Sequence, residues 1–348
     1  MVWRRFWLVF VAVLLGALGS LCAFVIIADP YDTLPFSPAL EREPVSTNQR
    51  FSFPALAASP RFDSAIFGTS TTRLLRPEKL NGLFAARFAN LSMNSATSHE
   101  QQRLYNLFIE HHRAPRMVIF GLDGEWCSTA PTLEDFTFRP FPPWLYDGNS
   151  WNDVLYLFNF SALEQAGRQV GFLAGLRTPK YGRDGYTNFL PPEDQYDLEK
   201  ARSHIYGPSG PTPTSVITAP QQSFSEQRKG WIYPAHSRMR DMLARLPGET
   251  VKVLMFVPYH NVRLPGKETL EWARWDECKH RLAALAADTP NAHTIDFMFP
   301  SEITTRDENY WDALHYSVRV AEQIAELIRI GISDRRGRIG LFNYIEPQ

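Results

Sequence analysis

An unbroken apolar stretch near the amino terminus is the strongest feature of the hydropathy pattern. Residues Phe6 to Ile27 carry no charge, and a helix of this length, at about 1.5 Å per residue, crosses a hydrocarbon core of roughly 30 Å. Arg4 and Arg5 precede the stretch, and Asp29 and Asp32 follow it. The positive-inside rule therefore predicts a single-pass signal anchor over residues 1–28 of the cell (inner) membrane. The amino terminus would be cytoplasmic and the main domain periplasmic or otherwise extracytoplasmic. A cleaved signal peptide is the alternative, although no small-x-small site precedes the acidic residues.

Beyond the anchor, strand-like and helix-like apolar patterns alternate. Six prolines interrupt residues 29–60, which predicts a linker without a long helix. Strands are then expected at 63–68, 85–93, 116–122, 249–257 and 293–299. Helices are expected at 76–83, 98–112, 236–246, 267–288 and 317–332. Five strands separated by helices predict an α/β domain over 61–335, with a mainly parallel sheet and helices on both faces, and a tail at 336–348.

A long insertion at about 127–235 interrupts this alternation. It is rich in proline and aromatic residues, with helices expected around 151–160 and 161–176, and its 207–222 stretch is expected to be mobile. Loops this long in a compact domain are usually functional lids or disordered segments. Both a substrate lid and a structural excursion that packs on the sheet remain open. Trp144 and Trp151 would accordingly stack on sugar rings or pack in the core.

Composition narrows the classes of function. The apolar fraction of 44% can form a large core, and a net charge of −1 provides no electrostatic case for binding nucleic acid. Of the three cysteines, Cys22 is expected in the bilayer. Cys127 and Cys278 are able to pair in an oxidising compartment, although nothing in the sequence requires it. No Cys/His cluster has the spacing of a zinc site, so no metal is expected.

Small and polar residues gather where the expected strands end. Gly68-Thr69-Ser70 follows the first strand, Asn90 to Ser95 follows the second, and Gly121-Leu122-Asp123 follows the third. The segment from Asp312 to His315 precedes the closing helix. Parallel strands place their carboxyl ends at one edge of the sheet, where open α/β proteins hold their sites. The four segments are therefore expected to converge.

Ser70, His315 and Asp312 have the chemistry of a nucleophilic triad. A histidine can take the serine proton, while an aspartate three residues away fixes its tautomer and stabilises the imidazolium. The structural alternatives are that Ser70 and Asp312 cap helices and that His315 packs beneath its helix. The combination of both segments in one chain favours the catalytic interpretation.

These segments resemble the sequence blocks of the SGNH (GDSL-type) hydrolase superfamily. The branch that they resemble most is the membrane-anchored, extracytoplasmic one, which includes alginate O-acetyltransferase-like and DltD-like proteins. Gly68-Thr69-Ser70 is similar to the nucleophile block, with Thr where Asp is common. Asn90-x-Ser-x-Asn-Ser95 is similar to the second block, which usually ends in Gly, and Gly121-Leu122-Asp123 to the third, which usually has Asn. Asp312-x-x-His315 is similar to the last block. The resemblance covers about residues 60–335 and implies a flavodoxin-like fold with strand order 2-1-3-4-5.

The resemblance implies a role for each matched residue. Ser70 would be acylated, His315 would be the base and Asp312 its orienter, while the amides of Ser70 and Ser95 would stabilise the oxyanion. Asp123 departs from the pattern, because an ionised carboxylate accepts hydrogen bonds but donates none. It would have to be protonated, pair with a cation such as Arg73, or do another job. Two further residues at this edge, Arg73 and His260, are candidates for substrate binding; a solvated arginine and a capped structural histidine are the alternatives.

The anchor and the resemblance together predict an O-acyltransferase or acetylesterase. Ser70 would pass an acyl group, expected to be acetyl, to a hydroxyl of an envelope or exported polysaccharide, or to water. No cofactor is expected, because acetyl-CoA is not expected outside the cell and the sequence has no nucleotide-binding loop. A membrane-bound acyltransferase partner would then deliver the acyl donor. The alternative is a catalytically degenerate protein that binds glycan or acts as a scaffold in an envelope complex.

Overall fold

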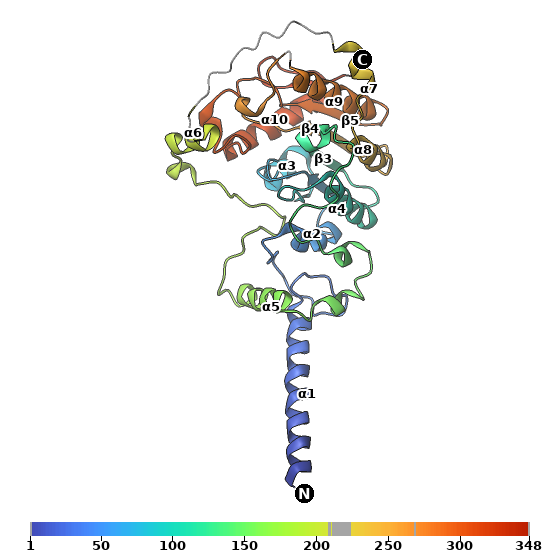
Figure 1. The fold of residues 1–348 in the computed structure, drawn as a ribbon, viewed down its shortest axis with the longest axis vertical. Coiled ribbons are helices and arrows are strands. Elements are labelled where there is room, and N and C mark those ends of the chain that lie inside the picture. Colours follow the sequence, from blue (N-terminus) through green and yellow to red (C-terminus); the bar gives the residue numbers. More distant parts are fainter. Residues whose placement is uncertain (1, 208–209, 211–223, 268, 347–348) are drawn as a thin grey trace. The chain divides into compact units, whose positions relative to one another are not determined.

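The computed structural model describes residues 2–346 except 208–209, 211–223 and 268. The chain divides into two compact units (Figure 1). The first contains Met1–Leu56 and Pro140–Arg183, and the second contains Ala57–Arg139 and Asp184–Gln348. The insertion is therefore shared between the units, since its middle part packs with the amino-terminal segment. Most of the 207–222 stretch, expected to be mobile, lies outside the described residues.

The first unit begins with α1 (Val2–Ala28), which is long and apolar enough to cross a membrane; a signal sequence would pass the same test. Arg42 closes its carboxyl-terminal end, because the guanidinium donates from Nε to the Ala28 carbonyl (2.9 Å) and from Nη2 to the Ile27 carbonyl (3.0 Å). These carbonyls have no partner within the helix. The chain outside the apolar segment is thereby fixed to the end of α1.

The middle of the insertion folds mostly into turns and one helix. Short 3₁₀ turns occur at η2 (Pro143–Tyr146) and η3 (Asp153–Tyr156), so the helix expected around 151–160 is a single turn. Asn159 explains the break, because its side chain accepts a hydrogen bond from the Ala162 amide (2.9 Å) and starts the next helix. That helix, α5 (Phe160–Leu173), contacts α1.

The segment expected to be a linker contains a buried helix, α2 (Gln49–Ala58), despite Pro54 in its interior. Proline has no amide hydrogen, so the carbonyl of Arg50, four residues earlier, loses its helical donor. The hydroxyl of Tyr146 replaces it, at 2.9 Å from this oxygen. The expectation of a linker over 29–60 is therefore wrong at its end, because a residue from the distant insertion satisfies the helix.

The second unit is built on a six-stranded sheet of order β2-β1-β3-β4-β5-β6. The first five strands are parallel, and the last is antiparallel to β5. This sixth strand comes from the expected tail, so the count of five strands was one short. The strands are β1 (Ser64–Phe67), β2 (Phe88–Asn90), β3 (Met117–Leu122), β4 (Val251–Phe256), β5 (Ala292–Asp296) and β6 (Asn343–Tyr344).

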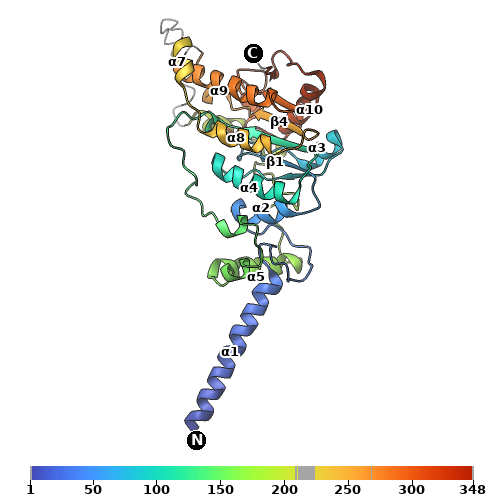
Figure 2. The ribbon, with the colours of Figure 1, turned by 90° about the vertical axis from the view of Figure 1, so that its right-hand side faces the viewer.

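Helices pack around this sheet in two groups. One group pairs α3 (Pro77–Phe84) with α10 (Val318–Asp334). The other group contains α4 (Ser98–His111), α8 (Ala235–Ala244), α9 (Leu270–Ala287) and the short α7 (Ser225–Gly230), as Figures 1 and 2 show. The remaining helix, α6 (Leu198–Tyr206), packs on the 3₁₀ turn η6 (Asp307–Asn309). At the start of α4, Thr97 and Glu100 form a capping box, in which each side chain accepts from the backbone amide of the other residue.

A disulfide joins Cys127 to Cys278, with 5.5 Å between the Cα atoms. It connects the 3₁₀ turn after β3, η1 (Gly124–Cys127), to α9. The pairing that the sequence left open is thus formed, and it braces the end of β3 next to Asp123.

Candidate active site

The turn after β1 is held by unusually close packing around Thr72. A side chain at Gly68 would place its Cβ 2.8 Å from the Thr72 Cβ, and one at Gly121 would place its Cβ 2.0 Å from the Thr72 Oγ1. Glycine at both positions therefore lets the turn fold onto β3. The side-chain amide of Asn90, at the end of β2, donates to the carbonyls of Arg73 (3.1 Å) and Leu75 (2.8 Å). Three neighbouring strands thus fix the turn that carries Ser70.

Ser70, His315 and Asp312 form a continuous hydrogen-bonded chain. The Ser70 Oγ lies 2.8 Å from His315 Nε2, and His315 Nδ1 lies 2.7 Å from Asp312 Oδ2. The second carboxylate oxygen of Asp312 accepts from the amides of Leu314 (2.8 Å) and His315 (2.9 Å). With Nδ1–H donating to the carboxylate, the unprotonated Nε2 faces the serine hydroxyl. This is the geometry of a nucleophile, a base and an orienting acid.

Asp312 is suited to remain ionised. Burial acts to raise its pKa, but hydrogen bonds from the His315 ring and from the two backbone amides outweigh burial and leave the pKa below 3.8. A carboxylate in this state stabilises an imidazolium as it forms. The electrostatics of the pair therefore favour proton transfer from Ser70 to His315.

The capping alternatives are wrong for this structure. The residue before α3 is Arg76, not Ser70. The cap of α10 is Ser317, whose side chain accepts from the Val320 amide (3.3 Å), and not Asp312. Both triad segments lie in turns outside the helices, where their side chains can meet.

His260 positions the histidine loop through its backbone. Its amide donates to the Ala313 carbonyl (3.0 Å). Its ring is buried: Nε2 lies 3.2 Å from Asp307 Oδ1, and Nδ1 accepts from the Val262 amide (3.2 Å). Burial lowers the pKa of His260 despite the neighbouring carboxylate. The structural alternative for this residue is therefore the one that the contacts favour.

Ser95 is the exposed residue of the second block and adopts a left-handed conformation, with φ of 52°. Glycine adopts this conformation at little cost, whereas other residues rarely do. The backbone at residue 95 is thus in the left-handed region that favours glycine, although the residue is a serine. It lies after β2, and the Met93 amide just before it donates to the Gly68 carbonyl (3.0 Å), which keeps this loop next to the serine turn.

Asp123 is 7% exposed and its pKa is raised by burial to about 6. Its carboxyl group bonds the Thr69 side chain and accepts from the Glu125 amide (3.1 Å). Thr69 immediately precedes Ser70, so the charge state of Asp123 is coupled to the nucleophile turn. The sequence left open whether Asp123 is protonated, pairs with a cation or has another role. The raised pKa supports a protonated, neutral carboxyl group at pH values below about 6.

Arg73 pairs with Asn94, whereas the sequence suggested Asp123 as its partner. Its guanidinium donates from Nη1 to the Asn94 side-chain oxygen and lies over the ring of Phe189, 4.9 Å from the centroid. The same ring meets that of His315 edge to face, with 5.2 Å between centroids. Sequence reasoning missed Phe189, because it lies in an irregular part of the insertion and follows no strand. Its only signal is a bulky aromatic residue next to the Leu190-Pro191-Pro192 segment.

A pocket of about 720 Å³ lies beside the triad loop. Trp311, which precedes Asp312, and Asn188, which precedes Phe189, both line it. The Trp311 amide donates to the His315 carbonyl (2.9 Å), so the pocket and the base share one loop. Other lining residues include Tyr196, Arg76, Arg319 and Glu322. Aromatic and charged groups in one open hollow are suited to a polyhydroxylated ligand.

Comparison with known proteins does not assign the chain to a family. No protein-family model matches the sequence, and a search of curated proteins finds no significant match.

Proposed function

We propose that this protein is a membrane-anchored serine O-acyltransferase or acetylesterase that acts on an extracytoplasmic polysaccharide. The observation that carries the proposal is the chain of contacts from Ser70 Oγ through both nitrogens of His315 to Asp312. Support also comes from the strand order, since 2-1-3-4-5 is that of flavodoxin-like folds, with a site at the carboxyl edge. Assignment to the SGNH-like superfamily is part of the same proposal.

In the first step, His315 Nε2 takes the hydroxyl proton as Ser70 Oγ attacks the acyl carbon. The amides of Ser70 and Ser95 and the neutral form of Asp123 would support the oxyanion. Each oxyanion donor is worth about 3 kcal/mol in measured enzymes. Collapse breaks the ester bond, and the imidazolium returns its proton to the leaving alcohol. This leaves an acyl-serine.

In the second step, a sugar hydroxyl or water loses its proton to His315 and attacks the acyl-serine. The acyl group leaves with the sugar oxygen, or as a free acid with water, and Ser70 regains its proton. The pocket lined by Trp311 and Tyr196 suits a sugar ring beside the reacting atoms. An anchor at α1 with the second unit outside would hold the site at an envelope polymer, and a membrane-bound partner would supply the acyl donor.

The test is ester turnover by the full-length protein in detergent, with p-nitrophenyl acetate as substrate. Ser70→Ala and His315→Ala are each expected to lower kcat at least about 10³-fold. Ser237→Ala is the matched control, because this exposed serine lies on α8 and should retain full activity. Turnover that is equal in all of these variants would overturn the proposal. It would favour the glycan-binding or scaffold alternative, which already has less support because the serine and histidine lie within hydrogen-bond distance.

A further inference from the structure

Helix α5 has an inverted pattern of polar and apolar positions. Its buried face consists of Ala162, Ala166 and two glutamines, of which Gln169 is fully buried and pairs its amide with the backbone of Glu43. Its exposed side chains include the large apolar residues Phe160 (91% exposed), Val170 (41%) and Leu173 (40%), beside the polar Ser161 and Glu164. A helix on a water-soluble unit normally buries its apolar stripe. The outer face of α5 is therefore suited to a less polar surrounding than water.

Further exposed apolar residues surround α5 within the first unit. Leu176 follows the helix and is 81% exposed, while Leu155 (73%) and Phe158 (51%) precede it. Trp151 is 68% exposed and tilts over Phe36. Aromatic residues with aliphatic neighbours at such positions are typical of the membrane–water interface.

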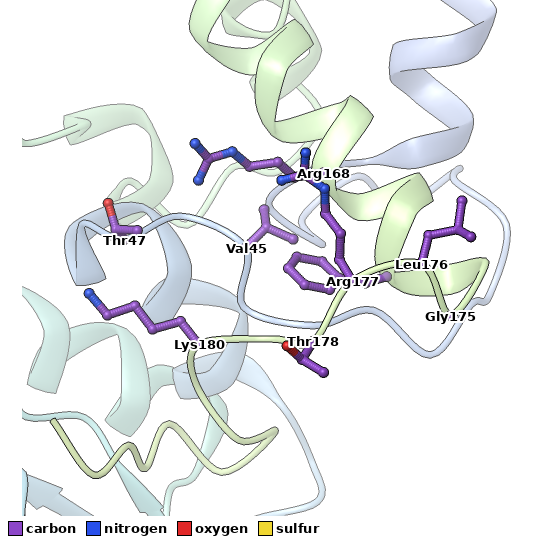
Figure 3. Close-up of a pocket in the computed structure, with 9 residues that line it drawn as sticks. Val45, Thr47, Arg168, Gly175, Leu176, Arg177, Thr178 and Lys180 are labelled. Carbon is purple, nitrogen blue, oxygen red and sulfur yellow. The ribbon is translucent and has the colours of Figure 1, made fainter. Parts of the chain in front are cut away.

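A cationic pocket of about 480 Å³ opens beside the same helix, as Figure 3 shows. Three basic side chains line it: Arg168 on α5, and Arg177 and Lys180 just after the helix. The Arg177 side chain packs against α5 at Gly171, where a Cβ would lie 3.1 Å from its Cδ. Arg168 pairs with Glu164 (2.7 Å). No acidic residue is among the residues that line the pocket, so it is suited to anions.

The position of α5 within its unit relates these features to the apolar helix. Both views show α5 lying across the carboxyl-terminal end of α1 rather than alongside it (Figures 1 and 2). If α1 crosses a bilayer, its end marks the bilayer surface, and α5 lies at that level. A helix of this orientation, apolar outside and flanked by basic groups, has the character of an interfacial helix.

We infer that the first unit lies on the membrane surface, with the outer face of α5 in the interfacial layer. The pocket of Arg168, Arg177 and Lys180 then binds the phosphate groups of anionic phospholipids in that membrane. Continuity with α1 selects the lipid surface as the occupant, and the positive charge selects anionic headgroups. The inference does not depend on the triad, because no residue of the second unit takes part.

Hydrogen–deuterium exchange of the full-length protein in nanodiscs tests the inference. Peptides covering 155–180 are expected to exchange several-fold more slowly in discs of phosphatidylcholine with phosphatidylglycerol than in phosphatidylcholine alone. The difference should shrink at high salt. In Arg168→Gln/Arg177→Gln/Lys180→Gln it should vanish, and retention of phosphatidylglycerol by native mass spectrometry should fall about fivefold for each cation removed. The control Arg113→Gln/Lys267→Gln/Arg336→Gln removes the same charge from exposed sites of the second unit and should behave like the parent.

The apolar contact is tested separately with Phe160→Ser/Leu176→Ser, at positions exposed enough that folding should be retained. This variant should exchange faster at 155–180 in both kinds of disc, whereas Ile232→Ser/Ile339→Ser, two exposed residues of the second unit, should not. Equal exchange of the parent in both discs, or an unchanged triple variant, would overturn the inference. Protection that appears only when a soluble acidic polysaccharide such as polygalacturonate is added would also overturn it.

Discussion

Phe189 meets His315 edge to face, at an interplanar angle of 88° and with 5.2 Å between ring centroids. The same phenylalanine also contacts the guanidinium of Arg73, 4.9 Å from its ring centroid. One aromatic side chain from the insertion therefore contacts both His315 and Arg73. Its ring is therefore placed to restrain the imidazole.

Replacing Phe189 should weaken catalysis without abolishing it. Aromatic pairs contribute about 0.5–1.5 kcal/mol beyond their burial, so Phe189→Ala should lower kcat/KM by roughly two- to tenfold. Water should also enter more freely, so transfer of acetyl to an added alcohol should fall relative to hydrolysis. Phe189→Tyr keeps the ring and should retain the parent ratio. A Phe189→Ala enzyme with unchanged kcat/KM and transfer ratio would show that the ring contact has no role.

Asp312→Asn should lower kcat by roughly 10⁴-fold while leaving the fold intact. The amide cannot stabilise the imidazolium, and it favours the wrong tautomer of His315. The loss is measured by comparing kcat of the variant with kcat of the parent protein across a range of pH. Asp307→Asn is a useful comparison, because this carboxylate contacts His260, a buried histidine that is not part of the triad, and should affect stability more than kcat. A loss of kcat in Asp307→Asn as large as in Asp312→Asn would contradict the assignment of roles.

Asp123 should make activity fall as the pH rises through about 6, the value to which burial raises its pKa. Above this pH the carboxylate is ionised and repels the developing oxyanion. Asp123→Asn keeps a neutral donor at every pH, so its activity should exceed that of the parent at pH 8 and match it near pH 5. If the parent and Asp123→Asn have the same pH profile, ionisation of Asp123 does not affect the reaction at Ser70.

The same carboxyl group should also make stability depend on pH. Its pKa is raised in the folded state, so its favourable contribution is complete below the ordinary value of 3.8 and is lost as the pH rises through about 6. The difference corresponds to about 3 kcal/mol at about 1.4 kcal/mol per pH unit. Asp123→Asn should therefore raise the apparent Tm at pH 8 but not at pH 4, as thermal unfolding in detergent will measure.

Ser95→Gly should stabilise the protein slightly, by about 1 kcal/mol or less, because φ at this position is 52°. Ser95→Ala leaves the left-handed strain in place and should produce no such gain. Thermal unfolding of the two variants side by side provides the comparison. A lower Tm for the glycine variant than for the alanine variant would contradict this reading of the backbone.

Tyr146→Phe should destabilise the first unit by about 1–2 kcal/mol. The variant removes the hydroxyl that bonds the Arg50 carbonyl and leaves this oxygen without the donor that Pro54 cannot supply. Exchange of amides in 49–58 should accelerate. Tyr156→Phe is the control, since Tyr156 is about half exposed and should be neutral.

The elements that sequence reasoning predicted well are those with strong local signals. The run from Ser64 to Phe67 is wholly apolar after its first residue and buried, and the order of strands and helices implied that Ser70 and His315 would share an edge. The expected meeting of Ser70 and His315 is confirmed, because this convergence depends on topology, which the alternation of elements specifies.

The features that were missed depend on contacts between distant residues. Helix α2 needs a hydroxyl from Tyr146 to tolerate its proline, and strand β6 needs the edge of β5 to pair with. Phe189 lies in a loop whose path no periodicity describes. The raised pKa of Asp123 follows from burial, which a linear pattern at a strand end does not reveal.

Acylation of Ser70 can be observed by peptide mass spectrometry after rapid acid quenching. Full-length protein is mixed with p-nitrophenyl acetate, quenched within the first turnover and digested. An added acetyl group is expected on the peptide that contains Ser70, and it should be absent from Ser70→Ala and from His315→Ala quenched at the same time. Consumption of the ester with acetyl on other residues and none on Ser70 would contradict it.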